Sequence, residues 1–172
     1  MALVAAIVIP GLLSSGISTN QDNALASVLA IASAQGKLRN NDLDKNGQKD
    51  YWRDDIAGLY AHIPPASSQQ LKLIEISIAL ADASPVTKGV SDTLEPRPKA
   101  RYLFRSLRFS DENPASLDPD RFAAHAFPEM LDAGKHMFIA THEGFVWKKP
   151  AELGGIQVVP AEPSADGWYR VK

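Results

Sequence analysis

The sequence contains no cysteine among its 172 residues, which excludes disulfide bonds, thiolate zinc sites and a cysteine nucleophile. It also lacks a marked excess of either charge, because 18 basic and 20 acidic side chains give a net charge of −2. No global attraction to phosphate follows, so we expect no nucleic-acid partner. With 45% hydrophobic and 22% charged residues, the composition excludes disordered and fibrous classes and predicts one folded domain.

The chain also lacks the short motifs of common catalytic sites. It has no G-x-S-x-G elbow, no phosphate-binding glycine loop and no dinucleotide fingerprint. His142 and Glu143 begin the H-E-x-x-H pattern of zinc proteases, but Val146 stands where the second histidine belongs. The four histidines are scattered singly, and we predict surface or strand-edge positions for them. We therefore predict that the protein is not an enzyme.

Ionisable side chains are missing from residues 1–21, and residues 1–13 (MALVAAIVIPGLL) are almost wholly apolar. Thirteen helical residues span about 20 Å, which is less than the roughly 30 Å hydrocarbon thickness of a bilayer. The basic residues that open a secretory signal peptide are also absent. Either this segment is buried in the fold, or the chain begins inside a longer element. We favour the second, and two explanations of it stay open: the true start lies upstream of Met1, or this copy has lost its export and assembly signals.

Apolar residues recur at helical spacing after the first segment. The residues at i, i+3, i+4 and i+7 of one face are Leu25, Val28, Leu29 and Ala32. Gly36, followed by basic residues, marks the expected C-terminal end. We predict one long helix over residues 1–38, apolar on all sides in residues 1–13 and amphipathic in residues 20–38. Half of its length would stand clear of the rest of the domain.

The remaining residues, 39–172, are expected to form a globular head. Apolar spacing and alanines predict a helix over residues 71–83, although alternating isoleucines there also fit a strand. After Pro85 the pattern becomes typical of strands, which we predict at residues 101–109, 121–127, 137–140 and 145–149, the last two joined as a hairpin at Gly144. Helices followed by strands predict an α+β fold, in which the long helix packs against a small antiparallel sheet.

The densest group of oxygen ligands lies in the polar loop at residues 40–50. Its alternating members are Asp42, Asp44, Asn46, Gln48 and Asp50, with Gly47 at the turn, as in the first half of an EF-hand loop. The pattern fails at the twelfth position, where Arg53 stands in place of the closing glutamate. Two interpretations stay open, a calcium loop and a solvated turn. Calcium is the one cofactor for which the sequence gives a candidate site.

Several of these segments together resemble a known family. Residues 3–15 (LVAAIVIPGLLSS) are similar to the later part of the hydrophobic helix of type IV pilins and type II secretion pseudopilins, in which a proline follows an Ala/Ile run. The blocks DLDKNGQKDYW, LKLIEISIALADA, KARYLFRSLRF and MFIATHEGFVWKK resemble, in this order, a group of uncharacterised bacterial pilin-like proteins. The resemblance covers nearly the whole chain. It departs at the front, where the family's basic leader, phenylalanine and glutamate do not precede the apolar run.

The resemblance implies a structural subunit of a cell-envelope filament or secretion apparatus. Such subunits anchor the apolar half of the helix in the inner membrane, with the head in the periplasm or outside the cell, and then assemble with copies or with other pilin-like subunits. Calcium stabilises a head loop in major pseudopilins, which supports the loop at residues 40–50 by analogy. Two other classes stay open: a solitary membrane-tethered binding domain of the envelope, and a hydrolase with an unrecognised site.

Overall fold

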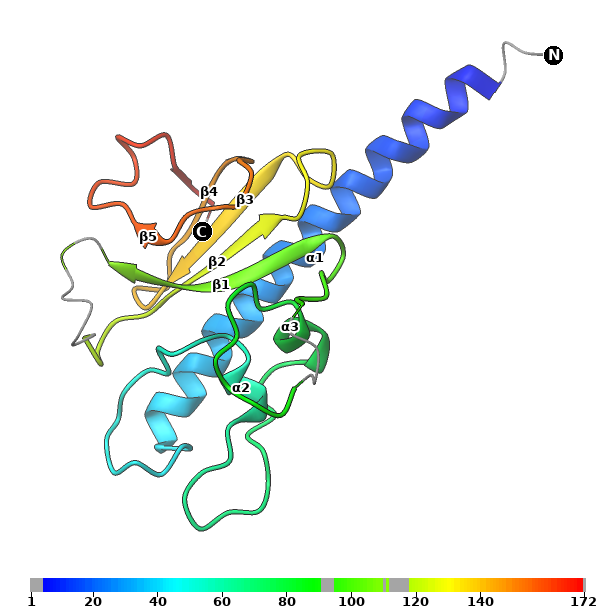
Figure 1. Ribbon diagram of the computed structural model, residues 1–172. Coiled ribbons are helices and arrows are strands. Elements are labelled where there is room, and N and C mark those ends of the chain that lie inside the picture. The colour runs from blue at the N-terminus through cyan, green and yellow to red at the C-terminus, as the bar shows by residue number, and fades with distance from the viewer. Residues whose placement is uncertain (1–4, 91–94, 110, 112–117, 172) are drawn as a thin grey trace.

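A computed structural model describes residues 5–90, 95–109, 111 and 118–171, and for residues 5–14 it describes the backbone alone (Figure 1). The elements in chain order are α1 (Ala5–Asn41), α2 (Gly58–Ala61), α3 (Ile76–Leu80), β1 (Tyr102–Phe109), β2 (Ala123–Pro128), β3 (His136–Thr141), β4 (Val146–Pro150), β5 (Val158–Val159) and β6 (Tyr169–Arg170). Helices come first and strands follow, so the fold is α+β.

The six strands form one mixed sheet in the order β5-β1-β2-β3-β4-β6. Strands β1 to β4 pair with their neighbours in antiparallel fashion, and β6 adds to β4 in the same way. Strand β5 instead runs parallel to β1, where Val158 lies opposite Arg108. The prediction of a purely antiparallel sheet is therefore wrong at this edge. The chain leaves β4, crosses one face of the sheet and joins its far edge in the same direction as β1.

Helix α1 contains 37 residues, which corresponds to about 55 Å. It continues past residue 38 to Asn41, and in Figure 1 it lies along one face of the sheet and extends beyond the sheet towards its N-terminus. Its buried apolar residues recur every three or four positions and are Ala24, Val28, Ile31, Ala34 and Leu38. The sheet presents small residues to this face, namely Ala124, Ala126 and Ala140. Small side chains let the helix and the sheet approach closely.

The opposite face of the sheet has its own core. Side chains alternate between the two faces along each strand, so Leu107, Met137 and Ile139 point away from α1. They pack beneath Val159 and Trp168, which belong to the segment that crosses from β4 to β1 and back. This segment therefore covers one face of the sheet as α1 covers the other.

His125 lies at the centre of this second core, and the predicted surface or strand-edge position is wrong for it. The residue is fully buried in β2, where its Nδ1–H donates to the Phe138 carbonyl at 2.9 Å and its Nε2 accepts the Ile156 N–H at 3.2 Å. Burial, with a smaller contribution from the charge of Arg105, lowers the pKa of His125 to about 4. The neutral imidazole thus acts as a hydrogen-bonding core residue.

The segment between α1 and β1 is less helical than predicted. In place of a helix over residues 71–83, α3 spans five residues, Ile76–Leu80. Before it, the Leu71 and Leu73 N–H groups donate to the His62 and Leu59 carbonyls at 2.9 Å. After it, the chain at Asp82 makes a parallel bridge to β1 at Phe104. These hydrogen bonds to distant residues replace the helical ones, which local propensity cannot anticipate.

Two buried carboxylates fix this segment. Asp82 accepts three backbone N–H groups, from Ile56 at 2.7 Å, Ala57 at 2.8 Å and Ser84 at 2.9 Å. Asp55 accepts backbone N–H groups and side-chain donors, which are Gly58 N at 2.8 Å, Val86 N at 2.8 Å, Thr87 N at 2.6 Å, Thr87 Oγ1 at 2.9 Å and Trp52 Nε1 at 3.1 Å. We call this pair the Asp55/Asp82 clamp. It joins the chain around α2 to the chain that follows α3.

Candidate functional site

Helix α1 passes from the head to its projecting part near Asn20. There the Asn20 Nδ2 donates to the Ala133 carbonyl at 3.1 Å, and the Gln21 side-chain oxygen lies 2.8 Å from His136 Nδ1. Both partners belong to the turn between β2 and β3 or to the start of β3. Before this point Ser15, Gly16, Ser18 and Thr19 are exposed. The head therefore contacts α1 from Asn20 onwards, and the four exposed residues before Asn20 are not covered by it.

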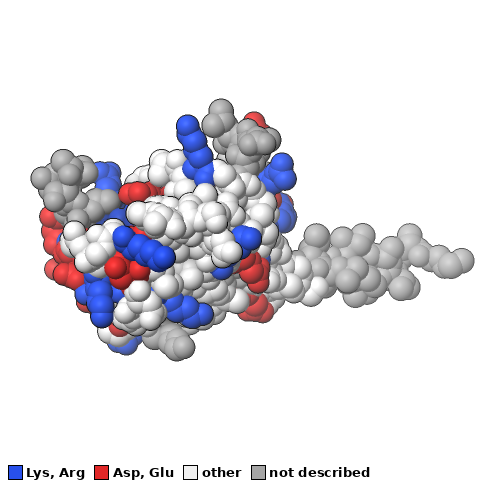
Figure 2. Space-filling view, turned by 90° about the horizontal axis from the view of Figure 1, so that it is seen from below, with Lys and Arg blue, Asp and Glu red and all other residues white. Residues whose placement is uncertain are grey.

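The loop that follows α1 contains the residues predicted to bind calcium. Figure 2 shows acidic side chains, with Lys and Arg among them, gathered at one end of the head. In the loop, Asn46 Nδ2 lies 2.9 Å from Asp44 Oδ2 and 3.2 Å from both carboxylate oxygens of Asp50. An amide N–H2 group, the positive end of a dipole, thus occupies the space between two carboxylates. That space is also where a cation would be stabilised.

Burial distinguishes Asp44 from an ordinary loop aspartate. Only 7% of the residue is exposed, and its Oδ1 atom has no hydrogen-bond partner within the part of the chain that the structure describes. Oδ1 of Asp42 is likewise buried and unpartnered there. Burial raises the pKa of Asp44, and the negative charge of Asp50 and the contact with Asp42 raise it further. A raised pKa means that burial disfavours the ionised form of Asp44.

The end of α1 adds to this negative potential. The carbonyl groups of a helix C-terminus carry a partial negative charge, and Asp42 follows Asn41 directly in a left-handed conformation with φ of 45°. Lys45 and Lys49 are exposed and make no ion pair with the loop carboxylates among the described residues. The local field in the loop therefore favours a bound cation.

The predicted ligands are only partly brought together. Asp42, Asp44, Asn46 and Asp50 cluster, but no described contact places the Gln48 side chain with them, and only its backbone N–H donates to Asn46 Oδ1 at 2.7 Å. Arg53, at the position of the closing glutamate, donates to the Asp118 carbonyl at 2.7 Å. Across the described ranges, no group of three or more His, Asp or Glu side chains is arranged to hold a metal ion. Cation binding would therefore need Asn46 and Asp50 to turn.

Comparison with known proteins gave no relatives: no family model, curated protein or solved structure matches the chain. Among the described residues, no helix combines the length and the hydrophobicity that crossing a membrane requires.

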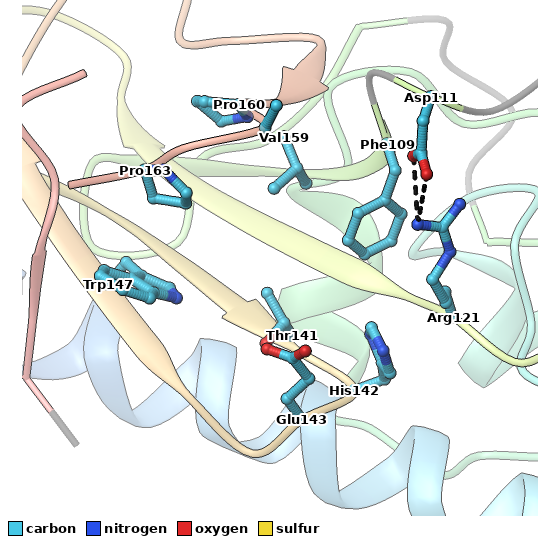
Figure 3. A pocket seen from close by; sticks show the side chains of 11 residues that line it. Phe109, Asp111, Arg121, Thr141, His142, Glu143, Trp147, Val159, Pro160 and Pro163 are labelled. Atoms are coloured by element: carbon cyan, nitrogen blue, oxygen red, sulfur yellow. Dashed lines mark hydrogen bonds and ion pairs between the residues drawn. The ribbon is translucent and has the colours of Figure 1, made fainter. Parts of the chain in front are cut away.

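Sequence reasoning missed one polar site altogether. Thr141, at the end of β3, is 6% exposed, and its hydroxyl has no hydrogen-bond partner among the described residues. A threonine before a hairpin turn is ordinary in sequence terms, so no signal distinguished it. The residue lines a cavity together with Phe109, Trp147 and Val159 (Figure 3).

Proposed function

We propose that the protein is a pilin-like or pseudopilin-like structural subunit that assembles through the N-terminal part of α1. The observation that supports this most is the continuity of α1. One helix runs from Ala5 to Asn41, and among the residues whose burial is described, 15–41, hydrogen bonds to the head begin at Asn20 and buried apolar positions begin at Ala24. An elongated helix held by a globular head at one end suits a subunit of a cell-envelope filament or secretion apparatus.

The physical requirement for assembly comes from the sequence of the projecting part. Residues 1–13 are almost wholly apolar, and the helical backbone from residue 5 runs beyond the sheet (Figure 1). An apolar helix outside its own head needs lipid or other helices around it. We infer that this stretch lies in the inner membrane before assembly and packs against equivalent helices afterwards. The head would then lie in the periplasm or outside the cell.

Cross-linking in cells tests assembly. A lysine-reactive cross-linker applied to intact cells should give a ladder of multimers, whereas a solitary membrane-tethered domain should stay monomeric. Replacing Ile7→Asp places a charge in the apolar stretch and should abolish the ladder, because a charged residue is costly in a membrane or helix bundle. Ile7→Leu is the matched control and should preserve the ladder.

The head provides an internal check on that experiment. Since the head contacts α1 through Asn20 and Gln21 and the turns that follow them, Ile7→Asp should leave the melting temperature of the purified full chain unchanged. Monomer alone for the unmodified protein, at levels where the cross-linker reacts with a known multimer in the same cells, would contradict the assembly proposal.

We also propose that the loop at residues 42–50 binds calcium and so stabilises the head. The supporting observation is the buried, unpartnered Oδ1 of Asp44. Calcium should raise the melting temperature and a chelator should lower it, because a ligand that binds only the folded state stabilises that state. Asp44→Ala should remove the shift, and Asp22→Ala, the same change on the exposed face of α1, should retain it. An unchanged melting temperature at millimolar calcium would contradict this proposal.

A further inference from the structure

Two consecutive apolar side chains are exposed where α1 leaves the head. Met130 and Leu131 are 56% and 55% exposed, and in the described part of the chain no other two neighbouring residues are both large, apolar and exposed. They belong to the segment that joins β2 to β3, residues 129–135, which we call the basal turn. In Figure 1 the basal turn lies beside α1, at the end of the head from which the helix projects. This end of the head therefore presents an apolar surface next to the helix.

Two contacts hold the basal turn against α1. Inside the turn, the Ala133 carbonyl accepts the Asn20 Nδ2–H at 3.1 Å. Directly after the turn, His136 Nδ1 lies 2.8 Å from the side-chain oxygen of Gln21. The basal turn thus lies at a fixed level along the helix, that of Asn20.

The turn that precedes β1 holds the basal turn in shape at a conformational cost. Ala100 and Arg101 have φ of 48° and 63°, which only glycine adopts without strain. The Arg101 guanidinium donates to Glu129 at 3.1 Å and to Asp132 at 2.9 Å, and its carbonyl accepts the Glu129 N–H at 3.0 Å. Strained backbone persists where surrounding contacts fix it. The fold therefore fixes the basal turn and neutralises its two acids, while it leaves Met130 and Leu131 exposed.

The sequence of α1 indicates what surrounds the basal turn. Residues 1–13 are almost wholly apolar, residues 14–19 (SSGIST) are mostly small and polar, and the first ionisable side chain is Asp22. Leu13 precedes Asn20 by seven residues, which is about 10 Å along the helix. The headgroup layer on each side of the hydrocarbon is roughly 5–8 Å thick. With residues 1–13 in the hydrocarbon, the level of Asn20 therefore lies at the outer boundary of the headgroups.

This depth favours lipid over a protein as the neighbour of the basal turn. A surface beside a membrane-embedded helix faces the bilayer from which that helix emerges. Apolar side chains at this level gain stability by entering the boundary between headgroups and acyl chains. The acids of the turn do not oppose entry, because Arg101 pairs with both of them.

We infer that the basal turn is a second membrane contact of the protein, in which Met130 and Leu131 insert into the headgroup layer beside α1. The inference rests on the membrane placement proposed for residues 1–13. A single helix leaves the head free to tilt and rotate about its anchor. A helix together with an adjacent turn determines which side of the head faces the membrane.

Single cysteine labels can measure this contact, because the chain has no cysteine of its own. The full chain is reconstituted in vesicles of phosphatidylethanolamine and phosphatidylglycerol that carry a nitroxide quencher at the headgroup. A fluorophore is attached at one exposed position in each of three variants. Lys135→Cys reports on the basal turn and Ser15→Cys on α1 before Asn20. Ser68→Cys reports on the loop between α2 and α3, which lies at the opposite end of the molecule (Figure 1).

Quenching should be on the order of threefold stronger at Ser15→Cys and Lys135→Cys than at Ser68→Cys, because only the first two positions lie at the depth of the quencher. Strong quenching at Ser15→Cys, with Lys135→Cys no more quenched than Ser68→Cys, would overturn the inference and leave the membrane placement of α1 intact. Absence of quenching at Ser15→Cys would contradict that placement and overturn the inference with it.

A double substitution assigns the contact to the apolar side chains. Met130→Ser combined with Leu131→Ser should reduce quenching at Lys135→Cys to the level of Ser68→Cys. Quenching at Ser15→Cys should stay as it is, because α1 is unchanged. Undiminished quenching at Lys135→Cys would show that lipid contact does not depend on the apolar pair, and would overturn the inference.

Two controls separate lipid contact from damage to the fold. The melting temperature of the double variant should equal that of the parent, because both side chains are exposed. Ile63→Ser removes a similarly exposed side chain from the loop between α2 and α3, and should leave quenching at Lys135→Cys unchanged. An equal loss of quenching with Ile63→Ser would contradict a contact specific to the basal turn.

Discussion

The Asp55/Asp82 clamp and the loop at residues 42–50 are both acidic, and both contain buried carboxylates, but they differ in what faces those carboxylates. In the clamp, backbone N–H groups and the Trp52 and Thr87 side chains donate to the carboxylate oxygens. In the loop, Oδ1 of Asp42 and of Asp44 receive no donor from the described residues. The first arrangement needs nothing further, whereas the second has unused binding capacity.

The difference teaches how to separate structural from functional acids by their geometry. Burial alone does not distinguish them, since Asp44, Asp55 and Asp82 are all buried, with 7%, 1% and 1% of each residue exposed. The number of donors does distinguish them. A carboxylate whose oxygens accept hydrogen bonds from the protein stabilises the fold. A buried carboxylate without such donors is a candidate site for binding an external ligand.

The largest effect should come from breaking the clamp. Asp55→Ala leaves the N–H groups of Gly58, Val86 and Thr87 without their acceptor, so we expect a loss of about 3–5 kcal/mol in the free energy of unfolding. Urea denaturation measures this. Asp54→Ala changes the neighbouring, exposed carboxylate and should cost less than about 0.5 kcal/mol. Similar losses for the two variants would contradict the structural role of Asp55.

A pH titration separates the clamp from the histidine core. Burial raises the pKa of Asp82 to about 6 from 3.8, so between those values the folded state holds the extra proton and stability falls as pH rises. The lowered pKa of His125, about 4 against 6.5, has the opposite sign, because the unfolded state holds the extra proton and stability rises with pH. The two contributions oppose each other between about pH 4 and pH 6.

Removing the contribution of Asp82 to the pH dependence of stability should reveal that of His125. Asp82→Asn should make the free energy of unfolding rise with pH, relative to the parent, by about 1.4 kcal/mol per pH unit between pH 4 and pH 6. Urea denaturation at intervals of half a pH unit measures this slope. Asp22→Asn should give a curve parallel to that of the parent. A parallel curve for Asp82→Asn as well would show that Asp82 does not titrate in this range.

The smallest effect should come from the loop in the absence of calcium. Asp44→Asn removes a buried negative charge that lies near Asp42 and Asp50, and we expect it to raise the free energy of unfolding at pH 7 by about 1 kcal/mol. Thermal unfolding in a chelator measures the change. A loss of 3 kcal/mol would instead place Asp44 with the clamp residues and remove the contrast between the two regions.

Local pattern predicted the elements whose hydrogen bonds and packing are local. The strand predicted at residues 101–109 is β1, Tyr102–Phe109, and the hairpin at Gly144 is β3 with β4, because alternation and a positive-φ glycine specify both. The helix predicted over residues 71–83 failed for the opposite reason. Leu71 and Leu73 donate to residues that precede them by nine and fourteen positions, from Leu71 to His62 and from Leu73 to Leu59.

The candidate sites differ in the same way, since features that depend on nearby residues could be predicted and features that depend on distant residues could not. The loop composition predicted that Asp42, Asp44, Asn46, Gln48 and Asp50 would cluster, since they are close in sequence, and the structure brings together all of them except the Gln48 side chain. Neither the burial of Asp44 nor the missing hydrogen-bond partner of the buried Thr141 hydroxyl could be predicted, because each depends on which distant residues approach it. The wall of the cavity beside Thr141 likewise comes from β1, β4 and the segment around β5, which the chain brings together only in three dimensions.

The course of the chain after β4 has a consequence for crowded surroundings. Both outermost strands of the described sheet, β5 and β6, are two residues long, and they come from the same crossing segment. Short outer strands offer little backbone for strand addition by a neighbouring molecule. In an assembly of the proposed kind, β5 and β6 would therefore offer a neighbouring head little free backbone to pair with.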